Sequence, residues 1–138
     1  MKKIIASIIV TLIGFCGFAE NHELNDKFVN ALITVESAGR NYAVGDNGRA
    51  VGCLQIWSTV VDDVNKTSKV KYTYNDRKNR AKSIAICKAY LTKYGRAYQR
   101  KTGKKPTHEV YARIWNGGPS GYKKTNTKKY WNKVKKHL

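Results

Sequence analysis

Acidic residues are scarce in this sequence. Its 138 residues contain 9 Asp and Glu against 27 Lys and Arg, so the formal net charge is +18 with neutral histidine. A field of this size attracts nucleic acid, acidic lipid and anionic cell-wall polymer without choosing among them. The charge therefore restricts the class of partner without identifying it.

Proline and cysteine are also few, with two and three residues, and no segment is compositionally biased. These absences exclude collagen-like and linker-like chains. The three histidines, His22, His108 and His137, lie far apart without the spacing of metal ligands, so we expect no metal site and no other cofactor. Hydrophobic residues make up 41% of the chain, which is enough for the core of one domain.

The N-terminal segment has the pattern of a secretory signal. Two lysines near the start precede an uncharged run over residues 4–18, and Ala19 supplies the small side chain that a signal peptidase site needs. We expect a signal peptide over 1–19 and a secreted or periplasmic mature domain over 20–138. That domain would have 25 basic and 9 acidic residues and a net charge of +16. An uncleaved anchor is the alternative, although a spanning helix needs roughly 20 apolar residues.

Helical spacing of apolar residues predicts a mainly α fold. The first helix is expected over about 24–36, where Leu24, Phe28, Leu32 and Val35 recur, and Gly39 suits its end. Later helices are expected after a Ser58 cap, over about 79–100 with Gly103 at its end, after a Thr107 cap, and around Tyr130, Trp131 and Val134. Residues 41–52 are rich in Gly, Asp and Asn and predict a loop or short hairpin. The pattern favours a single helical domain with a short hairpin after its first helix.

Glu36 is the candidate catalytic residue. It is the only acidic residue between Lys27 and Arg40, and it stands at the end of the first expected helix. The negative end of the helix dipole and partial burial both favour the protonated carboxyl group, which a general acid needs. Position alone also allows a solvated glutamate at a helix end.

Three segments resemble the motifs of lysozyme-like lytic transglycosylases of the SLT type, in the goose-lysozyme-like superfamily. Residues 33–39 (ITVESAG) are similar to the family's E-S at the end of the catalytic helix. Residues 50–56 (AVGCLQI) are similar to its G-L-M-Q, and residues 114–119 (IWNGGP) to its A-Y-N-A-G, in the same order. The resemblance covers roughly residues 24–122 and implies an α+β lysozyme-like fold.

The resemblance implies Glu36 as the sole catalytic acid and base. The substrate-binding and cleft residues that it implies are Ser37, Leu54, Gln55, Ile56, Trp115, Asn116 and Gly118. Ser37 would hydrogen-bond in the cleft and Gln55 would contact the sugar. Trp115 departs from the family, which has a tyrosine there, because an indole donates a hydrogen bond but cannot accept one.

Cys53 is a second departure, since the family has an apolar residue at this place. The exported chain keeps Cys53 and Cys87 where oxidation is permitted. A disulfide would tie the cleft floor to the long helix, whereas two buried thiols would pack as small hydrophobes. The sequence leaves both open.

The implied reaction is cleavage of the β-1,4 bond between N-acetylmuramic acid and N-acetylglucosamine in peptidoglycan, leaving a 1,6-anhydro sugar. A hydrolytic lysozyme (muramidase) is the alternative, with Asp46, Asp62 or Asp63 helping to place a water. Asp46 also suits a turn, and Asp62 and Asp63 suit the first turn of a helix. A non-enzymatic cationic protein that binds the wall or a membrane is the third reading.

The expected partners are peptidoglycan glycan strands, cleaved by a monomer. Seven lysines between Lys123 and Lys136 can contact an anionic wall polymer or membrane surface, or form a solvated helix face. Trp57, Tyr111 and Trp115 are candidates for stacking on sugars or for the core. The sequence has no nucleic-acid-binding motif of the aromatic and basic type, so no nucleic acid is expected.

Overall fold

The computed structural model describes residues 22–138, so the expected signal peptide lies outside the described residues. The helices and strands are α1 (Asp26–Ser37), β1 (Val44–Gly45), β2 (Ala50–Val51), α2 (Ser58–Thr67), α3 (Arg80–Thr102), α4 (His108–Gly117) and α5 (Thr127–Val134). Short 3-10 helices lie at His22–Leu24, Asp46–Gly48, Tyr74–Lys78, Gly121–Lys123 and Lys135–His137.

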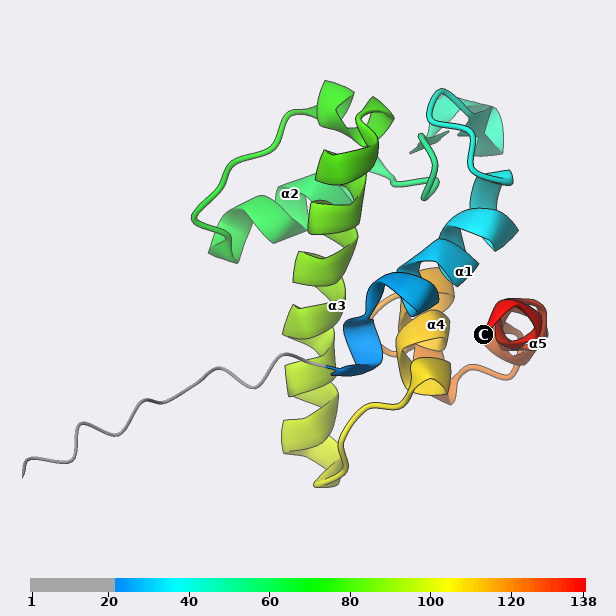
Figure 1. Ribbon diagram of the computed structural model, residues 1–138. Coiled ribbons are helices and arrows are strands. Elements are labelled where there is room, and N and C mark those ends of the chain that lie inside the picture. Colours follow the sequence, from blue (N-terminus) through cyan, green and yellow to red (C-terminus); the bar gives the residue numbers. More distant parts are fainter. Residues whose placement is uncertain (1–21) are drawn as a thin grey trace, which may run out of the picture.

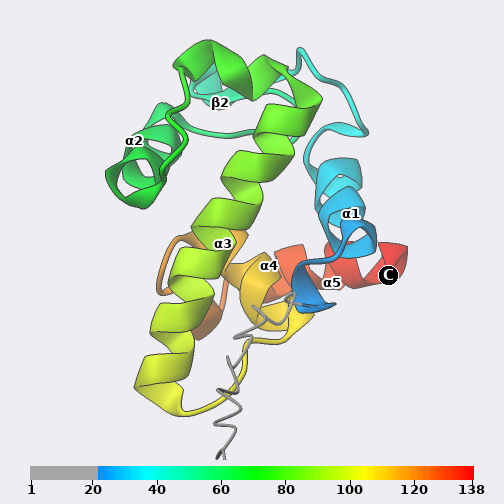
Figure 2. The same ribbon diagram turned by 60° about the vertical axis from the view of Figure 1, so that its left-hand side comes forward.

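Helix α3 runs the length of the molecule (Figure 1), and α2, α4 and the 3-10 helix at Tyr74–Lys78 pack against it. The β1–β2 hairpin and α2 lie toward its N-terminal end, and α4 and α5 lie nearer its C-terminal end, as the rotated view also shows (Figure 2). Helix α5 packs against both α4 and α1. The first and last helices of the described chain are therefore neighbours.

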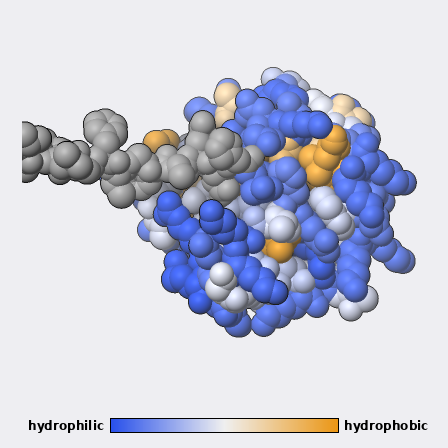
Figure 3. Space-filling model, turned by 60° about the horizontal axis from the view of Figure 1, so that its bottom comes forward, coloured by the Kyte–Doolittle hydropathy of each residue, from blue (hydrophilic) through white to orange (hydrophobic). Residues whose placement is uncertain are grey.

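One core joins all five helices. The buried side chains at its centre, each 0% exposed, are Phe28, Leu32, Val61, Ile86, Leu91, Ile114 and Val134. Figure 3 shows a surface that is mainly hydrophilic, with hydrophobic residues in small separate patches. The expected single helical domain with a hairpin after its first helix is confirmed.

Local signals set most helix ends. The Thr107 side chain accepts a first-turn backbone N–H and begins α4 as predicted. Ser58 is not the cap of α2, because Trp57 holds that position and Ser58 is already helical. An antiparallel bridge that ends at Ile56 keeps the chain extended up to this point. The C-cap of α1 is Ala38 (φ 52°), one residue before the expected Gly39.

The hairpin continues into a second, tighter loop. Strand β1 pairs with β2 through Val44 opposite Val51, and Val51 then exchanges two backbone hydrogen bonds of 3.1 and 3.0 Å with Ile56. Residues 52–55 close this loop, and Gln55 takes a left-handed φ of 50° that is costly for a residue with a Cβ. The second motif of the sequence is therefore a strained loop on the hairpin.

Cys53 and Cys87 are free thiols, 1% and 0% exposed. Burial raises the pKa of both thiol groups, so both stay neutral. They pack as small apolar side chains, which is the second of the two arrangements that the sequence allowed.

Over residues 22–138, no helix is long and apolar enough to cross a membrane. Within the same range, no three His, Cys, Asp or Glu side chains gather where they could hold a metal ion.

Gly52 marks a close approach of two backbone segments. Its φ is +84°, and a Cβ there would lie 1.8 Å from the carbonyl oxygen of Arg77. We expect Gly52→Ala to lower the free energy of unfolding by about 3 kcal/mol or more, since both backbones would have to move. Gly48→Ala is the matched control, because Gly48 has a φ of +86° but no atom within 4 Å of a Cβ.

Gly48→Ala should lower the free energy of unfolding by only about 1–2 kcal/mol, the cost of a left-handed conformation for a residue with a Cβ. Urea unfolding of both variants measures the difference. If both variants lose the same free energy of unfolding, the positive φ, and not the close approach to Arg77, is the reason for glycine at position 52.

Candidate active site

A cleft of about 700 Å³ separates the hairpin and the start of α2 from the end of α4. Its lining residues are Glu36, Asp46, Ala50, Gln55, Ile56, Trp57, Thr59, Val60, Tyr90, Trp115, Asn116, Gly117, Gly118 and Lys124. All three motifs of the sequence therefore reach one cavity. A cleft of this size can take several linked sugar rings or a comparable ligand.

Glu36 is the next-to-last residue of α1 and is half-buried in the wall of this cleft. Burial raises the pKa of its carboxyl group, and hydrogen bonds from Tyr130 and Trp115 and the charge of Lys133 oppose that rise. The net direction is upward. A carboxyl group with a raised pKa can hold a proton at a pH where a solvated glutamate has lost it, as a general acid must.

Tyr130 of α5 makes the shortest contact with this carboxyl group. Its hydroxyl donates to Oε1 of Glu36 at 2.6 Å. Burial and the neighbouring Glu36 raise the pKa of Tyr130 well above its usual range, so the hydroxyl keeps its proton and acts as a donor. Sequence reasoning placed Tyr130 on a helix face and missed this role, because spacing along α5 does not show what that face contacts.

Trp115 of α4 supplies the second hydrogen bond to Glu36. Its indole meets the ring of Tyr90 edge to face, with 5.8 Å between centroids and an interplanar angle of 84°. Tyr90, 7% exposed, lies at the cleft and braces the indole from α3. The tyrosine hydroxyl that position 115 lacks is therefore provided from α5.

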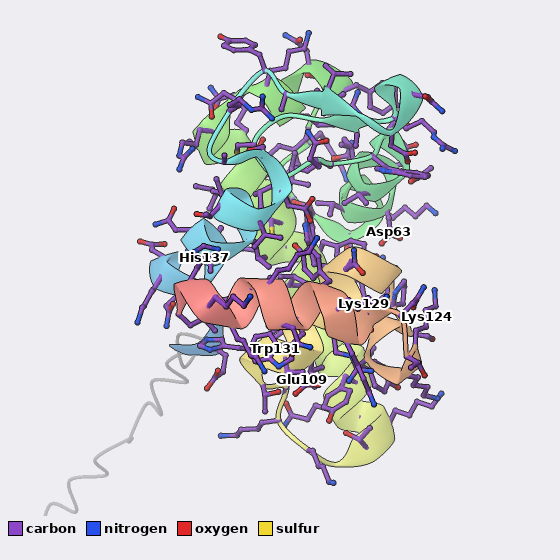
Figure 4. All side chains as sticks on the ribbon, turned by 90° about the vertical axis from the view of Figure 1, so that its right-hand side faces the viewer. Asp63, Glu109, Lys124, Lys129, Trp131 and His137 are labelled. Carbon is purple, nitrogen blue, oxygen red and sulfur yellow. The ribbon has the colours of Figure 1, made fainter. Side chains whose placement is uncertain are left out.

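Helix α5 runs across one face of the molecule (Figure 4). In that view Lys124 and Lys129 lie toward one end of the helix and His137 toward the other. Lys124 lines the cleft, and its ammonium group donates to the carbonyl of Gly117 at 2.7 Å. The lysine-rich segment thus borders the site directly.

Gln55 lines the cleft, but its amide group also has a structural task. Nε2 donates to the carbonyl oxygens of Ala43 and Gly52 at 3.2 and 3.0 Å, which ties the hairpin to the tight loop. Because both amide hydrogens are used, the side chain can offer a ligand only its oxygen. Gln55 can therefore accept a hydrogen bond from a sugar N–H or O–H.

Ser37 and Leu54 are buried at 4% and 0% exposure, and neither lines the cleft. The Ser37 hydroxyl donates to the carbonyl oxygen of Cys53 at 2.8 Å and joins α1 to the second motif. The structure thus corrects the expected hydrogen bond of Ser37 in the cleft. Leu54 is a fully buried residue of the core, and Ile56 is buried and lines the cleft.

Asn116 and Gly118 lie where the third motif was expected to shape the wall. Both line the cleft, and the side chain of Asn116 is exposed. Gly118 ends α4 with a φ of +82°, and its N–H donates to the carbonyl of Ile114 at 2.8 Å. This end of α4 brings Trp115 and Asn116 to the cavity.

Of the three candidate second carboxylates, only Asp46 lines the cleft. It pairs with Arg49 at 2.8 Å. Asp62 accepts from the Tyr74 hydroxyl, and Asp63 pairs with Lys93, so both are engaged outside the cavity. They lie in the middle of α2 and not in its first turn, which corrects both their expected place and their expected access to Glu36.

The chain matches the family model "Transglycosylase SLT domain" over residues 17–138. It belongs to this family. It is also similar to Lysozyme 1 of Crassostrea virginica, with 37% identity over 54 residues, which is 39% of this chain and 29% of the relative. The chain thus aligns with less than a third of the length of that relative.

Among solved structures, the chain is similar to one in the crystal structure of Aeromonas hydrophila PliI in complex with Meretrix lusoria lysozyme. The TM-score is 0.66 at 24% identity, and the match covers 81% of this chain and 88% of that chain. At this identity the likeness concerns the fold.

Tyr130→Phe removes the shortest hydrogen bond to Glu36. That bond favours the charged form, so its loss should move the pKa of the Glu36 carboxyl group further upward. A carbon-13 NMR titration of the carboxyl group measures the change. Tyr74→Phe is the control, because it removes a hydroxyl–carboxylate bond of 2.9 Å to Asp62 away from the cleft.

In the control, the pKa of the Glu36 carboxyl group should stay as in the wild type. A pKa that stays unchanged or falls in Tyr130→Phe would contradict the role assigned to the hydroxyl.

Proposed function

We propose that this chain cleaves the β-1,4 bond between N-acetylmuramic acid and N-acetylglucosamine in peptidoglycan, with Glu36 as the general acid. The observation that carries the proposal is the half-buried Glu36 carboxyl group, whose pKa is raised inside a cleft built from the three family motifs. Cleavage of a glycosidic bond needs a proton on the leaving oxygen, and a carboxyl group of this kind supplies it.

The surroundings of Glu36 suit both of its protonation states. Burial favours the neutral acid before cleavage. Once the proton has gone to the glycosidic oxygen, the hydroxyl of Tyr130 and the indole of Trp115 donate to the carboxylate that remains. Lys133 adds a favourable charge. One side chain can therefore give a proton and take one back.

The product that follows from a single carboxyl group is the 1,6-anhydro sugar. Glu36 protonates the glycosidic oxygen, the bond from this oxygen to C1 of N-acetylmuramic acid breaks, and the N-acetyl group of the same sugar assists its departure. The C6 hydroxyl oxygen then bonds to C1 and gives its proton to Glu36. This route consumes no water and restores the acid, as in a lytic transglycosylase.

The polar groups of the two cleft walls fit a glycan. The Gln55 oxygen can accept from an N-acetyl N–H, and the exposed Asn116 amide can both donate and accept. Lys124 at the rim carries a positive charge toward a substrate whose stem peptides carry carboxylates.

Hydrolysis is the second candidate, and the place of Asp46 favours it. Asp46 and Glu36 are the two carboxylates among the described residues that line the cleft. A muramidase places its second carboxylate beside the sugar, as nucleophile or to direct a water. The relative from Crassostrea virginica carries the name lysozyme, which agrees with this candidate.

The proposed setting is outside the cytoplasm, in a secreted or periplasmic monomer. All seven lysines between Lys123 and Lys136 are exposed, and no acidic residue follows Glu109 in the sequence. This surface supports electrostatic contact with an anionic wall polymer or membrane, which salt would weaken.

Glu36→Gln tests the proposed acid. The amide cannot give up and recover a proton, so we expect the release of soluble muropeptides from purified sacculi to fall at least about 100-fold, with sacculus binding retained. Glu109→Gln is the matched control, because Glu109 pairs with Arg113 at 2.9 Å and does not line the cleft. Normal digestion by Glu36→Gln would reject the site.

Mass spectrometry of the wild-type products separates the two candidate reactions. Anhydro-muropeptides support the transglycosylase, and products heavier by one water support the muramidase. Sacculi that release no soluble products would exclude both.

Asp46→Asn tests whether the second carboxylate takes part in the reaction. In a muramidase we expect kcat to fall at least about tenfold. Arg49→Gln is the control, because it breaks the same ion pair but keeps the carboxylate. In a transglycosylase, kcat should fall only modestly and by the same factor in both variants. A larger fall of kcat in Asp46→Asn would contradict the single-carboxylate route.

A further inference from the structure

Trp57 is an exposed tryptophan on the wall of the cleft. Its side chain is 39% exposed, and it stands at the N-cap of α2, directly after the bridge between Val51 and Ile56. The backbone on both sides of it is therefore fixed. Ligand pockets are commonly lined by aromatic side chains, so a ring that is partly open to solvent and lines the cleft is a candidate for ligand contact.

Arg49 covers one face of this indole. Its guanidinium carbon lies 4.7 Å from the ring centroid. The guanidinium is itself held, since Nη2 donates to Oδ1 of Asp46 at 2.8 Å and Nε donates to the Asp46 carbonyl oxygen at 3.2 Å. Arg49 is not among the residues that line the cleft, whereas Trp57 is. The uncovered side of the indole is thus the side available to a ligand.

The other aromatic candidates are engaged elsewhere. Trp115 donates to Glu36 and is braced by Tyr90, so its position serves the acid. Tyr111, 1% exposed, belongs to the core, which decides between its two expected roles. Trp131 packs against the core from α5 and does not line the cleft. Trp57 is the tryptophan whose ring has no task within the described fold beyond its contact with Arg49.

We infer that Trp57, held from behind by Arg49, is an aromatic platform on which one pyranose ring of the glycan stacks. A pyranose with equatorial substituents presents a flat face of C–H groups, and such a face packs on an aromatic ring. The inference rests on the proposed function, because it assigns one sugar of the same substrate to this wall. It adds a residue that determines how the strand is held, separate from the proton transfer at Glu36.

A remote stacking contact has a distinct kinetic signature. It holds the substrate before and during the reaction alike, so its loss raises KM and leaves kcat nearly unchanged. We expect Trp57→Ala to raise KM on solubilised glycan strands about tenfold, with kcat within about twofold of the wild type. Trp57→Phe keeps a flat ring and should recover most of the affinity.

Binding can be read without catalysis in the Glu36→Gln protein. Its three indole N–H resonances, assigned through single Trp→Phe variants, are followed by nitrogen-15 NMR during titration with the neutral tetrasaccharide of N-acetylglucosamine. The Trp57 resonance should shift and the Trp131 resonance should not. Trp57→Ala in this background should weaken binding about tenfold, and Arg49→Gln, which releases the ring, should weaken it by less.

Trp131→Phe is the matched control and should bind as the parent does. Three results would overturn the platform. The tetrasaccharide could bind without moving the Trp57 resonance, no indole resonance could shift at all, or Trp57→Ala could bind as tightly as the parent. The proposed function is judged separately, by the digestion of sacculi by the wild-type protein. If sacculi are digested but Trp57 does not bind sugar, only the platform is rejected. If sacculi are not digested, the proposed function is rejected.

Discussion

The hydrogen bond between Tyr130 and Glu36 is the contact on which the site depends. It joins side chains 94 residues apart and brings α5 against the end of α1. The helix can deliver this hydroxyl only because its own position is fixed. Val134 is fully buried, and Arg113 of α4 donates to the Thr127 hydroxyl at 3.0 Å and so anchors the start of α5. Packing between α4 and α5 thereby becomes a condition for the environment of the acid.

Most acidic side chains of the described fold make an ion pair with a basic residue, and Glu36 makes none with a described residue. Asp26, Asp46, Asp63, Asp76 and Glu109 each pair with a lysine or arginine. Glu36 instead receives hydrogen bonds from a phenol and an indole. In a chain with three times as many basic as acidic residues, a carboxyl group without an ion pair is a constraint on the whole cleft, even though the charge of Lys133 acts on it.

Much of the fold could be predicted from the sequence because its signals are local. Apolar spacing located the helices, Thr107 and Gly103 marked helix ends, and the turn residues after α1 located the hairpin. The place of Glu36 at the end of an apolar helix drew attention to it, and the resemblance of three segments to family motifs made it the candidate acid. These features depend on residues within a few turns of one another.

Contacts between distant elements could not be predicted. The pattern around Tyr130 shows a helix face but not that α1 lies against it, so the hydroxyl at Glu36 was missed. The resemblance placed the Ser37 hydroxyl in the cleft. The sequence does not show that this hydroxyl turns toward the carbonyl oxygen of Cys53 instead. Asp62 and Asp63 were equally ambiguous until the partners Tyr74 and Lys93 were known.

The separation of 94 positions between Glu36 and Tyr130 also imposes an order in time. At synthesis rates of roughly 5–20 residues per second, Glu36 leaves the ribosome about 5–20 s before the tyrosine that completes its surroundings. A nascent chain can fold α1 and the hairpin early, but it lacks α5 and the hydroxyl. Assembly of the proposed active site therefore has to wait for α5, and a product truncated before α5 would carry the acid without its partner.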